Sequence, residues 1–306
     1  MAIVDTGLLT KGLRSEFFGR FEAAPVRYRD FSTRVVSSGH SEVYRWLGST
    51  PQLREWGDGR LARGLRSESY SLENLKYEAT LEVDRDEIAD DQTGQIRVRV
   101  GELAQRAATH KDLLIAQLLD HGAEAGYHSY DGVPFFGDNH PSEEAALQSN
   151  RITSGASVPH LPQAGEFRAA LGQAITLILG LKDDRGEPMA LNAEGLYCVV
   201  PPNMLFAALE ALSGTLASGA TNVLAGVAPV LSFPWLAKTD AWYLLKTDGV
   251  VRPFIFQDRE PIEFTALTEE SEEGFKREKY LYGVRARYRM AYGYWQYAVQ
   301  VQFDEA

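Results

Sequence analysis

One stretch of the sequence, residues 90–122, constrains the fold more than any other because it has the pattern of a single long helix. Apolar or small side chains recur at steps of three, four or seven residues, which keeps one helix face dry. They are Ile96, Val100, Leu103, Ala107, Leu114 and Leu118, widened by Ala104, Ala108, Ile115 and Leu119. We expect Asp90 or Asp91 to cap the start and Gly122 to end the helix. A rod on the order of 45 Å long predicts a strut on which other segments, or other copies of the chain, lean.

The apolar stripe has one interruption, at His110 and Lys111, where the heptad step calls for an apolar side chain. Polar side chains are expected on the other faces of the helix, and these are Glu102, Arg106, Asp112 and Asp120. An average helix has roughly 12 residues, so an ordinary helix that flanks a core remains an alternative to the strut.

Composition limits the number of domains and the classes of partner that the chain can have. With 306 residues, of which 44% are hydrophobic, the chain can bury a core in one elaborate domain or two. A net charge of −11 argues against uniform attraction to nucleic acid or to an anionic membrane. The single cysteine, Cys198, lies in an apolar run and is expected to be buried. We find neither a signal peptide nor a membrane-spanning run, which predicts a soluble protein made and used in a cytoplasm.

Residues 1–42 have the pattern of an arm. A short amphipathic helix is predicted from Leu8, Leu9, Leu13, Phe17, Phe18 and Phe21. This apolar surface has no core of its own, so the arm packs either on the body of the chain or on a neighbour.

Two oppositely charged segments follow the arm. Residues 43–67 carry five arginines against two acids, whereas residues 68–91 carry nine acids against two basic residues. The alternation of residues 77–84 predicts a half-buried strand with an acidic face. We interpret the pair as an extended hairpin leading into this strand. Scattered solvated charges are one reading, and electrostatic register between two copies of the chain is the other.

Residues 166–258 have the pattern of a small α/β unit. Helices are expected over 167–181 and from Asn203, the second burying Leu205, Phe206, Leu209 and Leu212. Strands are expected at 196–200, 227–233, 242–245 and 254–257. A long strand or hairpin over 284–301 is expected to pair with residues 76–84 and bracket the long helix.

Few residues carry a chemical signature. Five side chains within twenty residues could present imidazoles and carboxylates to a divalent metal, namely His121, His128, Asp131, Asp138 and His140. Their spacing matches no ligand pattern, and a turn explains His140 before Pro141 equally well. Asp90 and Asp91 could act as an acid–base pair, but a helix start explains both. We therefore predict no catalytic residue, cofactor or metal site.

An ordered set of motifs resembles the Mu-like phage major head proteins. It consists of Glu55-Trp56 with Gly59-Arg60, Tyr70, residues 74–80, residues 83–91, residues 130–136 with His140-Pro141, residues 198–202, and the ending 282–287 with 291–296. The matches run in order from about residue 45 to 298 and cover most of the chain. The segments 43–67 and 150–190 match least clearly.

The resemblance implies an α+β chain with the Hong Kong 97-type phage capsid fold. It implies an N-terminal arm (1–42), an extended hairpin loop (43–80), a peripheral domain with the spine helix (81–165), an axial domain (166–258) and return strands of the peripheral domain (259–306). The implied function is that of a major capsid protein that self-assembles into an icosahedral phage or prophage shell around double-stranded DNA. Its location would be the virion, after assembly in the host bacterial cytoplasm.

The implied partners are other copies of the chain, in hexameric and pentameric capsomers. Scaffolding, protease, portal and decoration proteins are further candidates, as is packaged DNA held without sequence-specific binding, and no membrane is implied. We expect contacts between copies to involve Arg54, Trp56, Arg60, Arg63, Glu82 and Asp86. For Trp56, packing within its own loop remains an alternative. Two other functions remain open: a metal-dependent enzyme using the cluster at 121–140, and an encapsulin-like nanocompartment shell.

Overall fold

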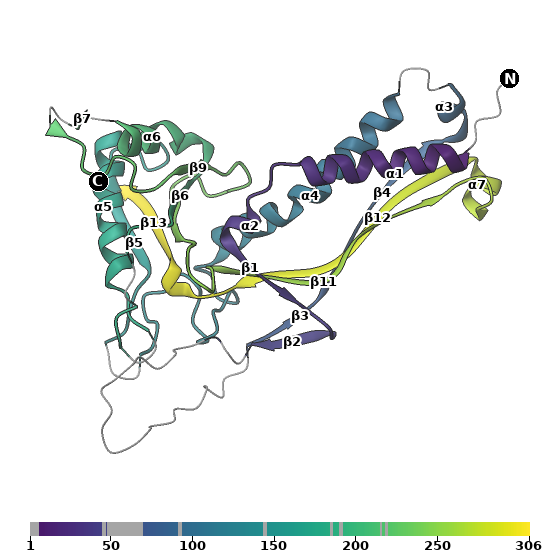
Figure 1. The fold of residues 1–306 in the computed structure, drawn as a ribbon. Helices are drawn as coiled ribbons and strands as arrows, with labels where there is room; N and C mark the ends of the chain where they lie inside the picture. Colours follow the sequence, from purple (N-terminus) through teal and green to yellow (C-terminus); the bar gives the residue numbers. More distant parts are fainter. Residues whose placement is uncertain are drawn as a thin grey trace, which may run out of the picture.

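The computed structural model describes residues 6–44, 47, 70–90, 94–142, 146–183, 186–189, 192–214, 216–217 and 220–306. Figure 1 shows a compact lobe, in which helices cover a sheet, and a long arm, in which helices lie along a ribbon of strands. The N-terminal helix α1 (Thr6–Ala23) lies in the long arm, whereas the C-terminus lies in the compact lobe (Figure 1). No helix of the described residues has the length and apolar character needed to cross a membrane.

The long arm is built on a four-stranded sheet with the order β1-β11-β12-β4. Its strands are β1 (Ser32–Val36), β11 (Phe254–Leu267), β12 (Lys279–Tyr292) and β4 (Leu75–Asp84). β4 alternates as predicted, with Val83 buried and Glu82 exposed on the opposite face. The expected pairing of β4 with the returning chain is confirmed, since β4 runs antiparallel to β12 with Val284 opposite Ala79.

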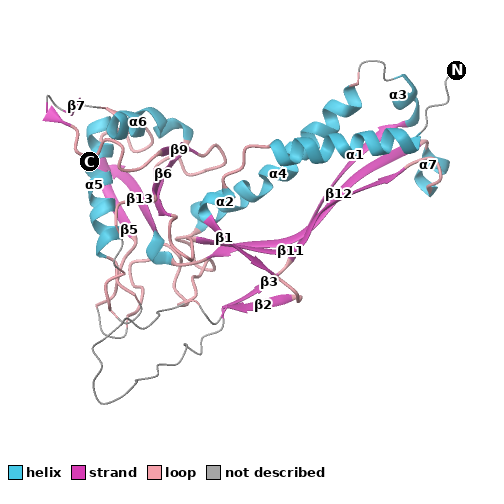
Figure 2. Cartoon of the chain, viewed as in Figure 1, coloured by secondary structure: helices cyan, strands magenta, loops and turns pink. Residues whose placement is uncertain are grey.

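The predicted strut is present as α4 (Gln95–His121), which lies along this sheet (Figure 2). Its 27 residues give a rod of about 40 Å. The expected start at Asp90 or Asp91 is wrong. Residues Arg85–Asp90 form a separate short helix, α3, and α4 begins after Gly94, whose φ of 74° breaks the helix. The expected end is confirmed, although Gly122 has a φ of −60° and not a left-handed conformation.

The N-terminal arm packs on the chain's own body. Helix α1 (Thr6–Ala23) lies against α4, and its Leu13 and Phe17 are fully buried. Leu13 and Phe17 form a small core with side chains of α3, α4, β4, β11 and β12. This core lies at the far end of the long arm and is separate from the main core. The short helix α2 (Tyr28–Phe31) then leads into β1. Of the two alternatives for the arm, packing on the body is therefore confirmed.

The compact lobe contains most of the α/β unit predicted for residues 166–258. Its sheet also includes strands at 151–156 and 298–305, from outside that range, and the strand expected at 254–257 belongs to the long sheet instead. Its sheet has the order β5-β13-β10-β6-β9. The strands are β5 (Arg151–Ala156), β13 (Ala298–Glu305), β10 (Ala241–Lys246), β6 (Leu196–Val200) and β9 (Val230–Ser232), and the helices are α5 (Ala164–Gly180) and α6 (Leu205–Ser213). Cys198 is fully buried on β6, as expected, and its burial raises the pKa of its thiol.

The buried face of α6 differs from the predicted one. Phe206 is 79% exposed and Leu209 37% exposed, while Ala208, Ala211 and Leu212 are buried. The chain enters α6 through a 3₁₀ turn, η1 (Pro202–Met204). Because a 3₁₀ turn has fewer residues than an α-helical turn, it rotates the face that an α-helical count from Asn203 would bury.

Two strand predictions are wrong in extent. β11 was expected to end at Gln257 but continues to Leu267 through a charged stretch, with register shifts between Asp258 and Glu263. The end of the chain is not one strand or hairpin. β12 leaves the long sheet at Tyr292, the turn η2 (Trp295–Tyr297) follows, and β13 enters the other sheet.

Two small hairpins complete the fold. β2 (Ser41–Tyr44) pairs with β3 (Tyr70–Glu73), so these strands form the base of the hairpin expected at 43–80. Of the residues between them, only Leu47 belongs to the described part of the chain. The second pair is β7 (Leu216–Ala217) with β8 (Ala220–Thr221), and α7 (Glu272–Arg277) closes the turn between β11 and β12.

Candidate functional site

The interruption in the apolar stripe of α4 lies where the N-terminal arm, α4 and the long sheet meet. Lys111 is only 8% exposed. Its ammonium nitrogen lies 4.7 Å from the ring centre of Tyr288, 5.2 Å from that of Tyr28, 5.3 Å from that of Phe256 and 5.7 Å from that of Phe21. Aromatic faces carry partial negative charge, so they stabilise a desolvated cation. The four rings therefore hold the N-terminal arm, helix α4 and the long sheet around one ammonium group.

Burial lowers the pKa of Lys111 from 10.5 to about 8, because the charged form loses its hydration. The nearby carboxylate of Asp258 opposes this change and the Arg29 guanidinium reinforces it. Among the described residues, no carboxylate lies within ion-pair distance of the ammonium. Lys111 is thus a buried cation that the chain surrounds with rings instead of a counter-ion.

Two further polar side chains of α4 bind backbone amides of other segments. Asp112 is fully buried and accepts hydrogen bonds from the amides of Arg27, at 3.1 Å, and Tyr28, at 2.6 Å, where α2 begins. Asp120 accepts one from the amide of Ala237 at 2.7 Å. Burial raises the pKa of both carboxyl groups, and the amides partly oppose it. The expectation that both aspartates lie on polar faces of the helix is therefore wrong.

His110 extends the ring cluster at the edge of the sheet. Its Nδ1 lies 2.6 Å from the hydroxyl of Tyr288, and its ring packs against Tyr77 with the centroids 4.7 Å apart. Burial lowers the pKa of His110, with Lys111 acting in the same direction. The two residues that interrupt the apolar stripe are therefore both packed against aromatic side chains, and the interruption was the sequence signal for this cluster.

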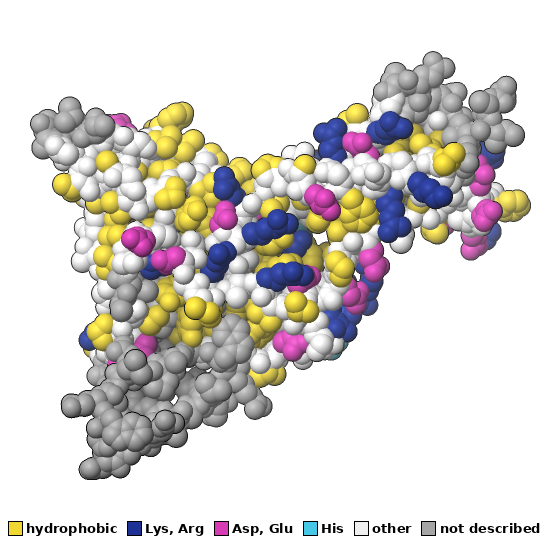
Figure 3. All heavy atoms as spheres, viewed as in Figure 1, with side chains coloured by type: hydrophobic (Ala, Val, Ile, Leu, Met, Phe, Trp, Pro, Cys, Tyr) yellow, Lys and Arg dark blue, Asp and Glu magenta, His cyan; other side chains and the backbone are white. Residues whose placement is uncertain are grey.

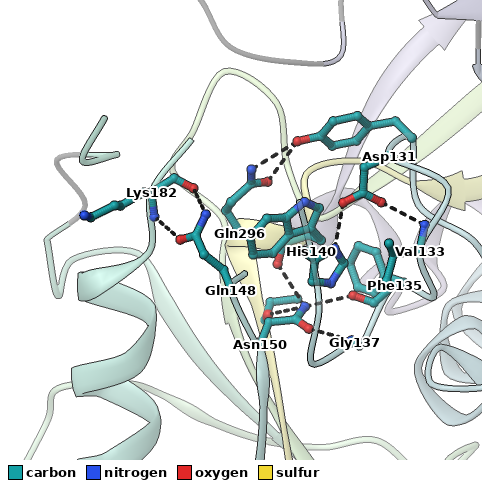
Figure 4. A network of polar contacts seen from close by, with 12 residues as sticks. Asp131, Val133, Phe135, Gly137, His140, Gln148, Asn150, Lys182 and Gln296 are labelled. Carbon is teal, nitrogen blue, oxygen red and sulfur yellow. Dashed lines mark hydrogen bonds and ion pairs between the residues drawn. The ribbon is translucent and has the colours of Figure 1, made fainter. Parts of the chain in front are cut away.

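The five side chains proposed as metal ligands do not converge. Only Asp131 and His140 meet, with Oδ2 and Nδ1 2.7 Å apart and both side chains buried (Figure 4). His121 pairs with Glu124, and the other two side chains have partners elsewhere. In the described ranges no three His, Cys, Asp or Glu side chains are placed to hold a metal ion. The geometry therefore does not support a metal-dependent site at 121–140.

The buried Asp131–His140 pair belongs to a structural network at the crossing between the two sheets. The His140 ring stacks on Trp295, with centroids 3.9 Å apart. Asn150 donates to the carbonyl oxygens of Phe135, Trp295 and Ala298 and accepts from Gly137 (Figure 4). These contacts hold η2, and hence the path from β12 to β13, in one conformation.

Of the residues predicted to make contacts between copies, two lie in the described part of the chain. Glu82 is exposed on β4, with its carboxylate 3.6 Å from the ammonium of Lys279. Asp86 is exposed in the first turn of α3. Arg54, Trp56, Arg60 and Arg63 lie outside the described residues.

Large apolar side chains are exposed at separate places on the surface. Phe275 on α7 is 87% exposed, Phe206 on α6 79%, Val223 85% and Val250 95%. Hydrophobic patches are also visible along the face shown in Figure 3, between clusters of charged side chains. Contiguous apolar patches mark surfaces that associate with other molecules, whereas apolar side chains exposed singly are common on monomeric proteins.

Comparisons with known proteins agree with this architecture. The family described as "Mu-like prophage major head subunit gpT" matches residues 7–161 and 237–304. The major capsid protein of Escherichia phage Mu is 27% identical over 292 residues, which cover 95% of this chain and 71% of that protein. The Mu-like prophage FluMu major head subunit of Haemophilus influenzae is 25% identical over the same shares of the two chains.

Solved structures show the same fold at lower identity. A chain from the procapsid of bacteriophage JBD30 superposes with a TM-score of 0.61 at 23% identity, covering 100% of this chain and 77% of that one. A chain of the virus-like particle from Pyrococcus furiosus has a TM-score of 0.55 at 11% identity, covering 95% and 98%. The fold is accordingly the Hong Kong 97-type capsid fold. The chain belongs to the Mu-like prophage major head subunit gpT family, and its function is that of a phage major capsid protein.

Proposed function

We propose that copies of this chain assemble into a closed icosahedral shell around double-stranded DNA, from rings of six and of five copies. The observation that carries the proposal is the match of a capsid-subunit family to most of the chain, on a fold with an arm that projects from the compact lobe. Heterologous contacts between such subunits generate closed rings. A net charge of −11 fits a container that holds DNA without gripping it.

We assign a role to each part of the chain. Residues 1–42 form an arm that braces the spine helix, 43–80 an extended loop, and 81–165 the peripheral domain with the spine helix. Residues 166–258 form the axial domain, and 259–306 return through the peripheral domain. Since β13 pairs with β10 and β5, residues Ala298–Glu305 of this return belong with the axial sheet.

We further propose that the arginine-rich loop of one copy meets the acidic surface of another. The base of that loop, β2–β3, precedes β4, whose exposed face carries Glu78 and Glu82. Arg54, Arg60 and Arg63 would supply the positive charge, and Glu82 and Asp86 part of the negative charge. Complementary charge fixes register and partner choice more than it adds affinity.

Electron microscopy of the expressed, purified chain tests the proposal. We expect closed shells or capsomer rings, located in the bacterial cytoplasm before release as virions. A small discrete oligomer with catalytic activity would contradict it. Shells that enclose protein and exclude nucleic acid would instead support the nanocompartment alternative. Co-purification during infection would then identify scaffolding, protease, portal and decoration partners.

A further inference from the structure

A pocket of about 720 Å³ has Lys111 in its lining. It is bounded by α2, β1, the start of β11 and the turn at 249–252. Its charged lining consists of Arg29, Arg34, Lys111, Arg252 and Asp258. Lys and Arg side chains gather over this region of α2 and β1 in Figure 3. The pocket is therefore strongly cationic in a chain whose overall charge is negative.

The chain itself neutralises little of this positive charge. Arg34 forms an ion pair with Asp258, with its Nη2 2.7 Å from the carboxylate. Arg29 donates to the hydroxyl of Tyr28, and Arg252 donates to the backbone oxygen of Arg29. Within the described ranges, Arg29, Lys111 and Arg252 have no carboxylate partner. Cations held together in a partly buried site favour an anionic ligand.

The walls of the pocket are apolar and aromatic, with Phe21, Tyr28 and Phe256 inside and Val250 at the rim. Lys111, more than nine-tenths buried, lies against these three rings. A narrow ligand that combines a carboxylate with an aromatic or aliphatic side chain fits such a lining. Duplex DNA fits poorly, because its phosphates lie on a surface too broad to reach a cation at this depth.

The chain carries a complementary surface at the tip of the long arm. There, Phe275 is 87% and Leu267 51% exposed, beside the acidic residues Glu269, Glu270, Glu272 and Glu273. Glu272 and Glu273 are partly neutralised by pairs with Lys276 and Arg277. Glu270 is exposed and has no ion-pair partner among the residues described. The tip thus combines a bare aromatic ring with an unpaired carboxylate.

Pocket and tip of one chain cannot meet. β11 lines the pocket as far as Ile262 and reaches the tip at Leu267, about 17 Å further at the usual rise per strand residue. Figure 1 shows the tip at the far end of the arm, where β11, β12 and α7 meet. Any contact between them joins two copies head to tail, which is the kind of contact that closes rings.

We propose that this pocket is a socket for the acidic, aromatic tip of a second copy, an inference that rests on the proposed assembly into shells. In the contact, the Glu270 carboxylate faces the unpaired cations, and Phe275 packs on the aromatic wall. The contact pairs charges that are unpaired in the single chain and covers a phenyl ring that is exposed there.

Charge reversal on each side tests the socket. The pocket variant is Arg29→Glu with Arg252→Glu, and the tip variant is Glu270→Lys with Glu273→Lys. Since close charge pairs across an interface couple by more than 1.4 kcal/mol, or about tenfold, each variant is expected to raise the concentration needed for assembly by about that factor. Combining the two variants in one chain restores most of the assembly. Sedimentation and electron microscopy measure the assembled fraction.

A matched control is Arg97→Glu with Arg99→Glu, which makes the same change in charge at exposed positions of α4. We expect near-normal assembly from it and native circular dichroism from all variants. Normal assembly of the pocket variant, or a combined variant no better than the pocket variant, overturns the socket. Normal shells that retain less DNA overturn it in favour of a phosphate site.

Failure of the socket can be told apart from failure of the proposed function. If the unaltered chain forms shells and the pocket variant does too, only the socket is wrong. If the unaltered chain forms no shells, subunits carrying Thr33→Cys and Phe275→Cys are mixed with a short bismaleimide. Cys198 is buried and gives little background. Cross-linked pairs then support the socket in a smaller assembly, and their absence overturns it.

Discussion

Lys111 shows how a single side chain can hold three segments together without a salt bridge. Four aromatic rings from the arm and the sheet surround its ammonium. A desolvated cation over rings gains about 2 kcal/mol, which offsets only part of the lost hydration, and the lowered pKa reflects the remainder. Stability therefore depends on whether this amine carries a proton.

We predict that Lys111→Met changes how stability depends on pH. The unfolded chain keeps the proton on Lys111 up to its ordinary pKa of 10.5, while the folded chain releases it near 8. The unfolded state therefore binds more protons between these values, and this residue makes folding more favourable as pH rises, by up to about 1.4 kcal/mol per pH unit. The measurement is the free energy of unfolding in urea at about pH 7.5, 8.5 and 9.5, which covers the lower part of this range.

The Lys111→Met protein is the reference for the wild type, because all other titrating groups are the same in the two proteins. The difference in unfolding free energy, wild type minus variant, should rise with pH across the window. Parallel profiles for the two proteins would show that the amine does not release its proton on folding.

A second residue-scale prediction concerns Asp112. Asp112→Ala leaves the partly buried amides of Arg27 and Tyr28 without their acceptor, which costs roughly 2–4 kcal/mol for the two donors. We expect the N-terminal arm to detach first, so that limited proteolysis near Pro25 becomes faster. The matched control is Asp120→Ala, which removes the same kind of contact from residues 237–238 and should leave that cleavage rate unchanged. Equal cleavage rates in the two variants would show that Asp112 does not specifically hold the N-terminal arm on α4.

The sequence could indicate where these residues lie but not what they do. His110 and Lys111 were visible as a break in the apolar period, because a period reports burial along one element. Their partners could not be foreseen, since Tyr28, Phe256 and Tyr288 come from three segments far apart in the chain. For the same reason, the proximity of His121 to His140 in sequence suggested a ligand cluster that the fold does not assemble.

At the scale of elements, periodicity predicted α4, α5, β4 and β6 because each has one buried face or two. It failed for the outer part of β11, where the strand carries charged side chains on both faces and contains Pro261. There, cross-strand ion pairs such as Arg287 with Glu260 take the place of an apolar pattern. The conformation of such a segment is determined by its pairing with a strand that is distant in the sequence, and a local sequence pattern does not contain that information.

We predict that Gly122→Ala destabilises the end of α4. A Cβ there would lie 2.7 Å from the ring of Phe136 and 2.9 Å from the carbonyl oxygen of Leu118, so helix end and loop must separate. Overpacking of this kind costs about 1–3 kcal/mol. Gly172→Ala in α5 is the control. Nothing lies within 4 Å of its added Cβ, so it should stabilise by about 0.5–1 kcal/mol. Thermal unfolding of both variants checks the opposite signs, and equal shifts would contradict the packing argument.

On the scale of the whole molecule, the arm, the lobe and the loop base extend in different directions (Figure 2). The far end of the long arm has a separate hydrophobic core, which stabilises it although it is distant from the lobe. Exposed apolar side chains such as Phe275 and Phe206 then lie on ordered supports. A subunit of this shape presents several separate surfaces to its neighbours, as a shell requires.

We predict that reversing Arg54, Arg60 and Arg63 to Glu impairs assembly and leaves the subunit folded. The reason is the opposite charge of segments 43–67 and 68–91, which would then repel each other across copies. Native circular dichroism with a loss of shells in electron micrographs is the expected pair of results. Normal shells from the triple variant would refute charge register.

The last prediction concerns Trp56, because large aromatic side chains next to arginine often dominate contacts between proteins. Trp56→Ala should give shells that dissociate at lower temperature and lower salt than wild-type shells. The comparison uses light scattering during heating and during a salt titration. Unchanged resistance to both would indicate packing of Trp56 within its own loop.

The ribbon of β11 and β12 has a mechanical consequence. It is anchored in the main core at Phe254 and Tyr292, runs outward as paired strands and carries α7 at its free end. β4 pairs with β12 and helix α4 lies along the same sheet, so the ribbon is braced over most of its length. A load applied at α7 is therefore transmitted through the braced ribbon to the lobe.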